Sequence, residues 1–174
     1  MNKAVPNIAP LFDLSSLNLT DFSDSFFSDQ QTANSDDEKF IVFFLDGELF
    51  AVSAEQVTEV VRPLAVTLLP NSPPWLCGIA NLRGEIISIL NLSKICNKKS
   101  APVSSKSKLI VLKPKNFASP VAFPVDRLSE LITLPKEAIE PAEDFCFSGK
   151  ALHESNFVHL LDTEKLFSSL LHNS

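Results

Sequence analysis

The sequence predicts an all-β fold with short helices, built from two copies of one small barrel or sandwich. Apolar runs of strand length are separated by turn signals about every eight to twelve residues, a spacing typical of all-β domains. The same pattern returns after a shift of 71 residues, and self-similarity at a fixed period indicates duplicated structural units. No run approaches about eighteen apolar residues, the length that would predict a membrane-spanning helix.

The first expected element is a β-hairpin. Residues 40–45 and 48–52 are apolar-rich runs, and Asp46-Gly47 lies between them. This dipeptide favours a two-residue turn, because such turns require positive φ at both central positions. The sequence therefore predicts two antiparallel strands at the start of the domain.

A short amphipathic helix is expected next. Ser53 with Gln56 three residues later has the spacing of a capping box. Val57 and Val60 follow at helical spacing, and Pro63 would end such a helix.

Three further strands complete the first copy of the unit. Residues 64–69 are expected to form one strand, and residues 75–82 and 85–90 two more. Arg83-Gly84 between the last two predicts a tight turn.

The repeat begins after an exposed Ser/Lys-rich linker at residues 97–108. A shift of 71 residues places residues 57–61 on residues 128–132, and the apolar classes stay in register over residues 51–95. Coincidence among short apolar strands is the alternative explanation.

The two copies differ at one turn. Residues 81–84 read NLRG in the first copy, whereas residues 152–155 read LHES in the second. A turn that carries an arginine in one copy alone favours a functional role over a requirement of the fold.

Acidic charge is concentrated at the N-terminus. The chain has 21 Asp and Glu against 15 Lys and Arg, a net charge of −6. Residues 1–38 hold seven of the acids and one of the bases. This composition predicts a disordered leader, in which Leu11, Leu14 and Leu17 could alternatively line one face of a short helix. Without a basic surplus, nucleic acid is excluded as the main partner.

Patterns for catalysis and metal binding are absent from the sequence. Its four glycines form neither a phosphate-binding loop nor a nucleophile elbow. The three cysteines lack ligand spacing and are expected to be reduced thiols in a cytoplasmic protein. The three histidines are separated by other elements and are expected to be satisfied or exposed: His153, His159 and His172. The sequence therefore predicts no enzyme activity, no cofactor and no metal, although a triad formed only in space would leave no sequence signal.

The block PNSPPWLCGIANLRG, residues 70–84, resembles the CheW family of chemotaxis coupling proteins. The preceding hairpin and the later segments VAFPVDRLSELITLPKEAIEP and HLLDTEKLF are similar to the family too. The resemblance implies two pseudo-symmetric five-stranded SH3-like β-barrels that share a hydrophobic core. It implies a domain over residues 39–174, with the first barrel mainly at about 40–96, the second mainly at about 108–160, and a closing segment to 171.

The resemblance also implies a non-catalytic signalling adaptor for chemotaxis, phototaxis or type IV pilus motility. Members dock a CheA-type histidine kinase, through its regulatory domain, beside the cytoplasmic tip of methyl-accepting receptors. A cytoplasmic protein is implied, recruited to receptor arrays at the inner membrane without inserting into it. The alternative function is an SH3-like interaction module that serves another signalling complex.

Five residues are candidates for partner binding by this resemblance. Val57 and Glu59 match positions in the receptor-facing region, and Asn81, Arg83 and Gly84 match the turn tied to coupling. Arg83 offers a planar donor fork suited to a carboxylate or to backbone carbonyls. Two alternatives stay open: Arg83 as an intramolecular clamp of its turn, and Val57 as a core residue.

Overall fold

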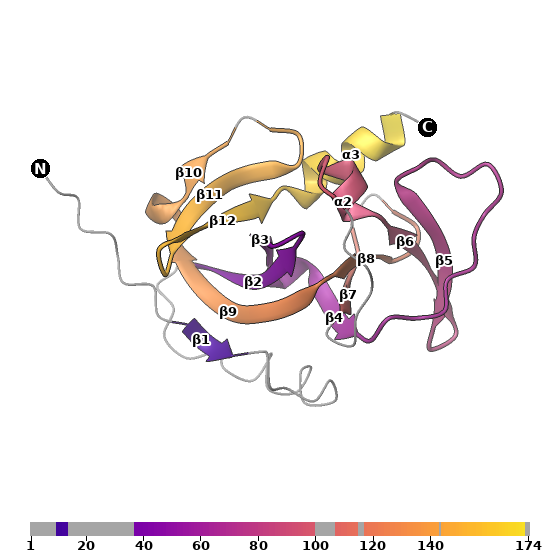
Figure 1. Cartoon of the computed structure of the whole chain (residues 1–174), viewed down its shortest axis with the longest axis horizontal. Helices are drawn as coiled ribbons and strands as arrows, with labels where there is room; N and C mark the ends of the chain where they lie inside the picture. Colours follow the sequence, from indigo (N-terminus) through magenta and orange to yellow (C-terminus); the bar gives the residue numbers. More distant parts are fainter. Residues whose placement is uncertain (1–9, 14–36, 100–106, 115–116, 143, 173–174) are drawn as a thin grey trace, which may run out of the picture.

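The computed structural model describes residues 10–13, 37–99, 107–114, 117–142 and 144–172 (Figure 1). These residues form two sheets with short helices, so the predicted all-β class is confirmed. The larger, sheet A, has seven described strands in the order β1 (Pro10–Asp13), β9 (Arg127–Pro135), β2 (Asp37–Leu45), β3 (Glu48–Ser53), β12 (Asn156–Leu161), β11 (Phe147–His153) and β10 (Glu140–Pro141). Sheet B has five, in the order β4 (Val57–Val61), β7 (Lys108–Leu112), β8 (Val121–Val125), β6 (Glu85–Leu90) and β5 (Leu76–Leu82). The helical elements are η2 (Ala54–Gln56), α2 (Leu92–Ile95), η3 (Lys136–Ala138) and α3 (Thr163–His172).

The predicted 71-residue repeat is present in the structure. Shifted by this period, β5 and β6 coincide with β11 and β12 at both ends. The first residue of α2 falls on the first residue of α3. Both copies therefore contain the same hairpin followed by a helix.

The two copies are interleaved, which corrects the predicted barrel boundaries. Sheet A joins β2 and β3 to strands that follow the linker, and sheet B joins β4, β5 and β6 to β7 and β8. Neither sheet is therefore confined to about 40–96 or to about 108–160. The exchange is made by two parallel pairs, β3 with β12 and β6 with β8, and by two antiparallel pairs, β2 with β9 and β4 with β7. Local patterns mark where strands begin and end, but they carry no signal for such long-range partners.

Three apolar clusters hold the sheets together. One is formed by sheet A, one by sheet B, and the largest joins residues of both sheets and both α-helices. Alternate residues of β2 and of β7 enter different clusters, so both strands are buried on both faces. A strand with two buried faces carries a continuous apolar run, as residues 40–45 and 109–112 do. The predicted shared core is confirmed.

The expected helix after Ser53 is wrong. The chain forms the three-residue η2, without a side-chain cap, and then strand β4 against β7. A β-bulge between Val57 and Glu59 inserts an extra residue, Thr58. Buried Val57 and Val60 are consequently three residues apart, a spacing that imitates a helix. The preceding hairpin is confirmed, with its Asp46-Gly47 turn at φ of 54° and 79°.

Residues 64–69 do not form the expected strand. Only an isolated bridge joins Thr67 to Ile79, through two backbone hydrogen bonds of 2.8 and 3.0 Å. Gly78 allows this close approach, since a Cβ there would lie 2.2 Å from the carbonyl oxygen of Thr67. The segment leaves large apolar side chains exposed: Val66, Leu68 and Leu69.

Most of the predicted leader, including residues 14–36, lies outside the described part of the chain. The described part of the leader includes β1, which pairs antiparallel with β9. The expected disorder is therefore wrong for residues 10–13, and Leu11 lies in a strand, not a helix. No helix among the described residues is long and apolar enough to cross a membrane.

Candidate functional site

The predicted coupling turn joins β5 to β6. Arg83 and Gly84 occupy it with φ of 52° and 93°. The side-chain oxygen of Asn81 accepts a hydrogen bond of 2.9 Å from the backbone N–H of Gly84. Because left-handed backbone favours glycine and is tolerated by few other residues, Gly84 and Asn81 fix the turn that presents Arg83.

Arg83 forms an ion pair with Glu59 of β4. Its Nη2 lies 3.0 Å from Oε2 of Glu59, and the two side chains are 79% and 24% exposed. β4 and β5 are the outer strands of sheet B, so this pair links the two ends of the sheet. Arg83 therefore does make the intramolecular contact that was the alternative to partner binding. An exposed ion pair contributes at most about 1 kcal/mol to the free energy of unfolding, however. Most of the guanidinium faces solvent and can accept a second anionic partner.

Val57 is a core residue. It is 4% exposed and belongs to the cluster shared by the two sheets. The neighbouring Thr58 faces outward, and its hydroxyl donates a 3.1 Å hydrogen bond to the carbonyl oxygen of Val111. Of the five candidates, the structure therefore brings Glu59, Asn81, Arg83 and Gly84 to the surface and leaves Val57 beneath it.

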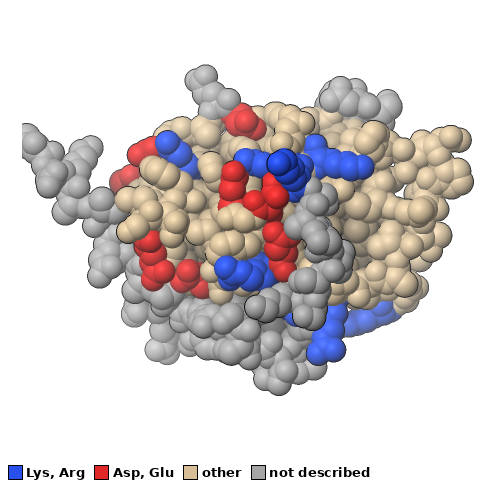
Figure 2. All heavy atoms as spheres, viewed as in Figure 1, with Lys and Arg blue, Asp and Glu red and all other residues tan. Residues whose placement is uncertain are grey.

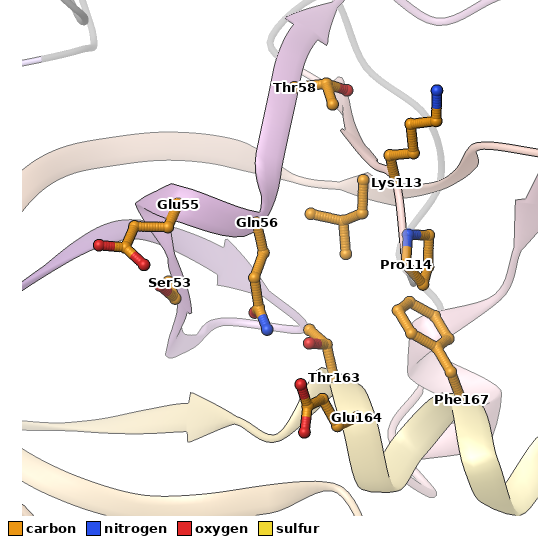
Figure 3. Close-up of a pocket in the computed structure, with 10 residues that line it drawn as sticks. Ser53, Glu55, Gln56, Thr58, Lys113, Pro114, Thr163, Glu164 and Phe167 are labelled. Atoms are coloured by element: carbon orange, nitrogen blue, oxygen red, sulfur yellow. The ribbon is translucent and has the colours of Figure 1, made fainter. Parts of the chain in front are cut away.

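A cleft of about 580 Å³ lies beside β4, between elements of the two sheets (Figure 3). Figure 3 shows Glu55 on one side and Lys113 on the other, with Gln56 and Thr163 between them and Phe167 projecting from α3. The lining residues are Ser53, Glu55, Gln56, Thr58, Leu112, Lys113, Pro114, Thr163, Glu164 and Phe167. Sequence reasoning missed this cleft because its residues come from η2, β4, α3 and the end of β7, which no spacing rule connects.

Charges and apolar groups are distributed unevenly over the surface. Acidic and basic side chains intermingle over the middle of the face in Figure 2, whereas the side formed by β5 and β6 shows few charges. Ile86 on β6 is 51% exposed and Leu68 is 78% exposed. Exposed apolar groups beside polar ones are typical of protein–protein contact surfaces.

The three cysteines are free thiols, as expected. Cys77 is half-buried, and burial raises its pKa. A hydrogen bond with Cys96, followed by burial, raises the pKa of Cys146 far above its usual value. Thiols held in the protonated form are poor nucleophiles, so neither Cys77 nor Cys146 is disposed to covalent catalysis.

Comparison with known proteins assigns the chain and its fold to a family. A family profile described as CheW-like domain matches residues 39–171. The chain belongs to the CheW-like domain family. The chemotaxis protein CheW of Klebsiella aerogenes is 29% identical over 140 residues, which cover 76% of this chain and 82% of that protein. Protein PilI of Pseudomonas aeruginosa is 27% identical over 110 residues, covering 58% of this chain and 62% of PilI.

The fold likewise matches a solved CheW structure. The scaffolding protein TtCheW from Thermoanaerobacter tengcongensis superposes with a TM-score of 0.68 and 29% identity, over 75% of this chain and 92% of that one. The expected pair of SH3-like subdomains is confirmed. As a CheW-like protein, the chain is a non-catalytic adaptor of chemotaxis-type signalling, which confirms the predicted function class. CheW-like proteins in general couple kinases to receptors.

Proposed function

We propose that this CheW-like chain docks the regulatory domain of a CheA-type histidine kinase beside the cytoplasmic tip of a methyl-accepting receptor, at arrays on the inner membrane. Membership of the family supports these partner classes. The observation that carries the proposal is Arg83, a strongly exposed cation on a rigid turn beside exposed apolar groups.

The proposed roles of the turn residues follow from their geometry. Arg83 binds a carboxylate or backbone carbonyls of a partner through its donor fork. Glu59 aims the guanidinium through the 3.0 Å ion pair, while Asn81 and Gly84 hold the turn. Val57 acts from within the core by positioning the bulged part of β4.

The cleft beside β4 is proposed as the surface for the receptor tip. A helical hairpin presents apolar stripes flanked by charges, and the cleft offers Phe167 and Leu112 with Lys113 and Glu55 at opposite sides. Amphipathic helices bind apolar grooves in this way.

The division of the chain into a leader, residues 1–38, and an adaptor domain, residues 39–174, is also proposed. The acidic charge of the leader and the family match that begins at residue 39 support it. Each pairwise contact is expected to be micromolar, about −8 kcal/mol, because repeated interfaces in an array supply avidity.

A capture experiment tests the proposal. The immobilised full chain is exposed separately to CheA-type kinases and to receptor cytoplasmic fragments, alongside Arg83→Ala and Arg62→Ala. Arg62 is a matched control, since it is an exposed arginine that directly follows β4. Arg83→Ala should weaken the binding of one partner class about tenfold, about 1.4 kcal/mol, and leave the binding of the other class unchanged. Arg62→Ala should leave the binding of both classes unchanged.

Two results would contradict the proposal. Capture of neither class, with binding to a different signalling protein, would support the alternative SH3-like module. Equal losses from Arg83→Ala and Arg62→Ala would show a general effect of surface charge and no specific contact.

A further inference from the structure

A second cluster of polar side chains lies at the turn between β11 and β12. This turn is the repeat counterpart of the coupling turn. The 71-residue shift places Glu130 at the position of Glu59 and Glu154 at the position of Arg83. Where sheet B pairs a carboxylate with a guanidinium, sheet A therefore brings two carboxylates together.

His153 completes this cluster. One ligand atom from each of Glu130, His153 and Glu154 lies within 4.8 Å of the other two. Two nearby carboxylates repel each other unless a positive charge lies between them. In sheet B a single carboxylate, that of Glu59, faces the guanidinium of Arg83, whereas in sheet A the group beside the two carboxylates is the imidazole of His153.

The burial of His153 is the second observation. It is 3% exposed, whereas its repeat counterpart Leu82 packs against the apolar cluster of sheet B. An imidazole in a position that suits leucine requires partners for both nitrogens. Its Nε2 lies 3.0 Å from Oε1 of Glu130, and its Nδ1 has no hydrogen-bond partner among the described residues. The sequence-based expectation of a satisfied or exposed histidine is therefore met at Nε2 and not at Nδ1.

We propose that Glu130, His153 and Glu154 form a binding site for a divalent transition metal, with Zn²⁺ the expected ion. Zinc takes imidazole nitrogen and carboxylate oxygen at about 2.0–2.2 Å, so two of its ligand atoms stand about 3.3–3.6 Å apart in a regular tetrahedron and about 3.0 Å apart where the angle at the metal narrows. The 3.0 Å separation of Nε2 and Oε1 fits such a pair. The buried imidazole disfavours Mg²⁺ and Ca²⁺, which prefer oxygen ligands.

The proposed ion would connect β9 to the turn between β11 and β12. β9 and β11 are not neighbours in sheet A, so a metal held by Glu130 and by the turn links strands that share no ladder. The Glu59–Arg83 pair links β4 to its turn in the same way. Exposed Glu154 can move to complete the coordination, and three protein ligands leave a position for water or for a partner's side chain.

Titration calorimetry with ZnCl₂ on the full chain, after chelator treatment, tests the site. His153→Leu restores the residue type of the repeat counterpart, so it should fold while removing the central ligand. Glu154→Gln changes an exposed side chain and removes the third. Cys77→Ser and His159→Gln are controls, because Cys77 is a half-buried thiol and His159 makes tilted ring contacts with two phenylalanines. Absorption of the Co²⁺-substituted protein reports the coordination independently of affinity.

One zinc ion per chain is expected, with affinity at least tenfold weaker in Glu154→Gln and lost in His153→Leu, while both controls bind as the unchanged chain does. The absence of binding would overturn the proposal and leave His153 and Glu130 as a buried pair. Unchanged binding in a folded His153→Leu variant, or loss of binding in Cys77→Ser, would overturn it equally.

Discussion

Phe43 joins the two sheets, and shortening it should destabilise both together. The residue lies on β2 and is fully buried in the shared cluster. Its ring centroid is 6.1 Å from that of Phe50 in sheet A and 5.8 Å from that of Phe123 in sheet B. Phe43→Leu removes both aromatic contacts, each contributing about 0.5–1.5 kcal/mol. We expect a loss of about 2 kcal/mol in the free energy of unfolding, which lowers Tm by about 4–8 °C for a chain of this size.

Urea denaturation followed by two probes checks this expectation. Trp75 is the only tryptophan and packs against the shared cluster, so its fluorescence reports the junction, while far-ultraviolet circular dichroism reports both sheets. The two transitions should coincide and move together to lower urea. Phe145→Leu, at a phenylalanine that is 49% exposed, is the matched control and should stay within about 0.5 kcal/mol. Separate transitions, or a loss no greater than that of the control, would refute a single core spanning both sheets.

Three further predictions concern single sites. Gly78→Ala places a Cβ 2.2 Å from a backbone carbonyl oxygen at a φ of 139°, so thermal unfolding should show a loss above about 2 kcal/mol; an unchanged Tm would contradict the contact. Burial raises the pKa of Cys77, so at any given pH less of it is the reactive thiolate than in a free cysteine. Its labelling rate should keep rising beyond the usual cysteine pKa, and buried Cys146 should react only after unfolding. Glu59→Gln removes the partner of Arg83 but should change urea stability by less than about 1 kcal/mol; a larger loss would show that the pair is structural.

Elements defined by neighbouring residues could be predicted from the sequence. The Asp46-Gly47 hairpin and the hairpin that contains Arg83-Gly84 were predicted because their turn residues require unusual backbone angles. The repeat was visible because corresponding strands bury the same positions. The exposure of the Arg83 turn could also be expected, since this turn carries an arginine where its repeat counterpart carries Glu154.

Features that depend on distant partners could not be predicted. The bulge at Thr58 gives a strand the apolar spacing of a helix, and only pairing with β7 reveals it. The interleaving of the copies depends on pairs between strands that are distant in the sequence, such as Leu49 with Val158. Glu130 and His153 are 23 positions apart, and no ligand-spacing rule joins them.

The interleaved topology explains how a non-catalytic chain can hold two partners in a defined geometry. The chain passes from sheet A to sheet B through η2 alone, and returns between β8 and β9 through the single residue Asp126. Two hydrogen bonds fix Asp126 in place. Its N–H donates to the carbonyl oxygen of Phe44 at 2.9 Å, and its carboxylate accepts from the N–H of Asp46 at 2.7 Å. Short, hydrogen-bonded crossings and a shared core leave no hinge between the sheets. In the proposed arrangement, with one partner at Arg83 and another at the cleft, the core sets the distance between them, so a core substitution such as Phe43→Leu should weaken coupling while touching neither partner.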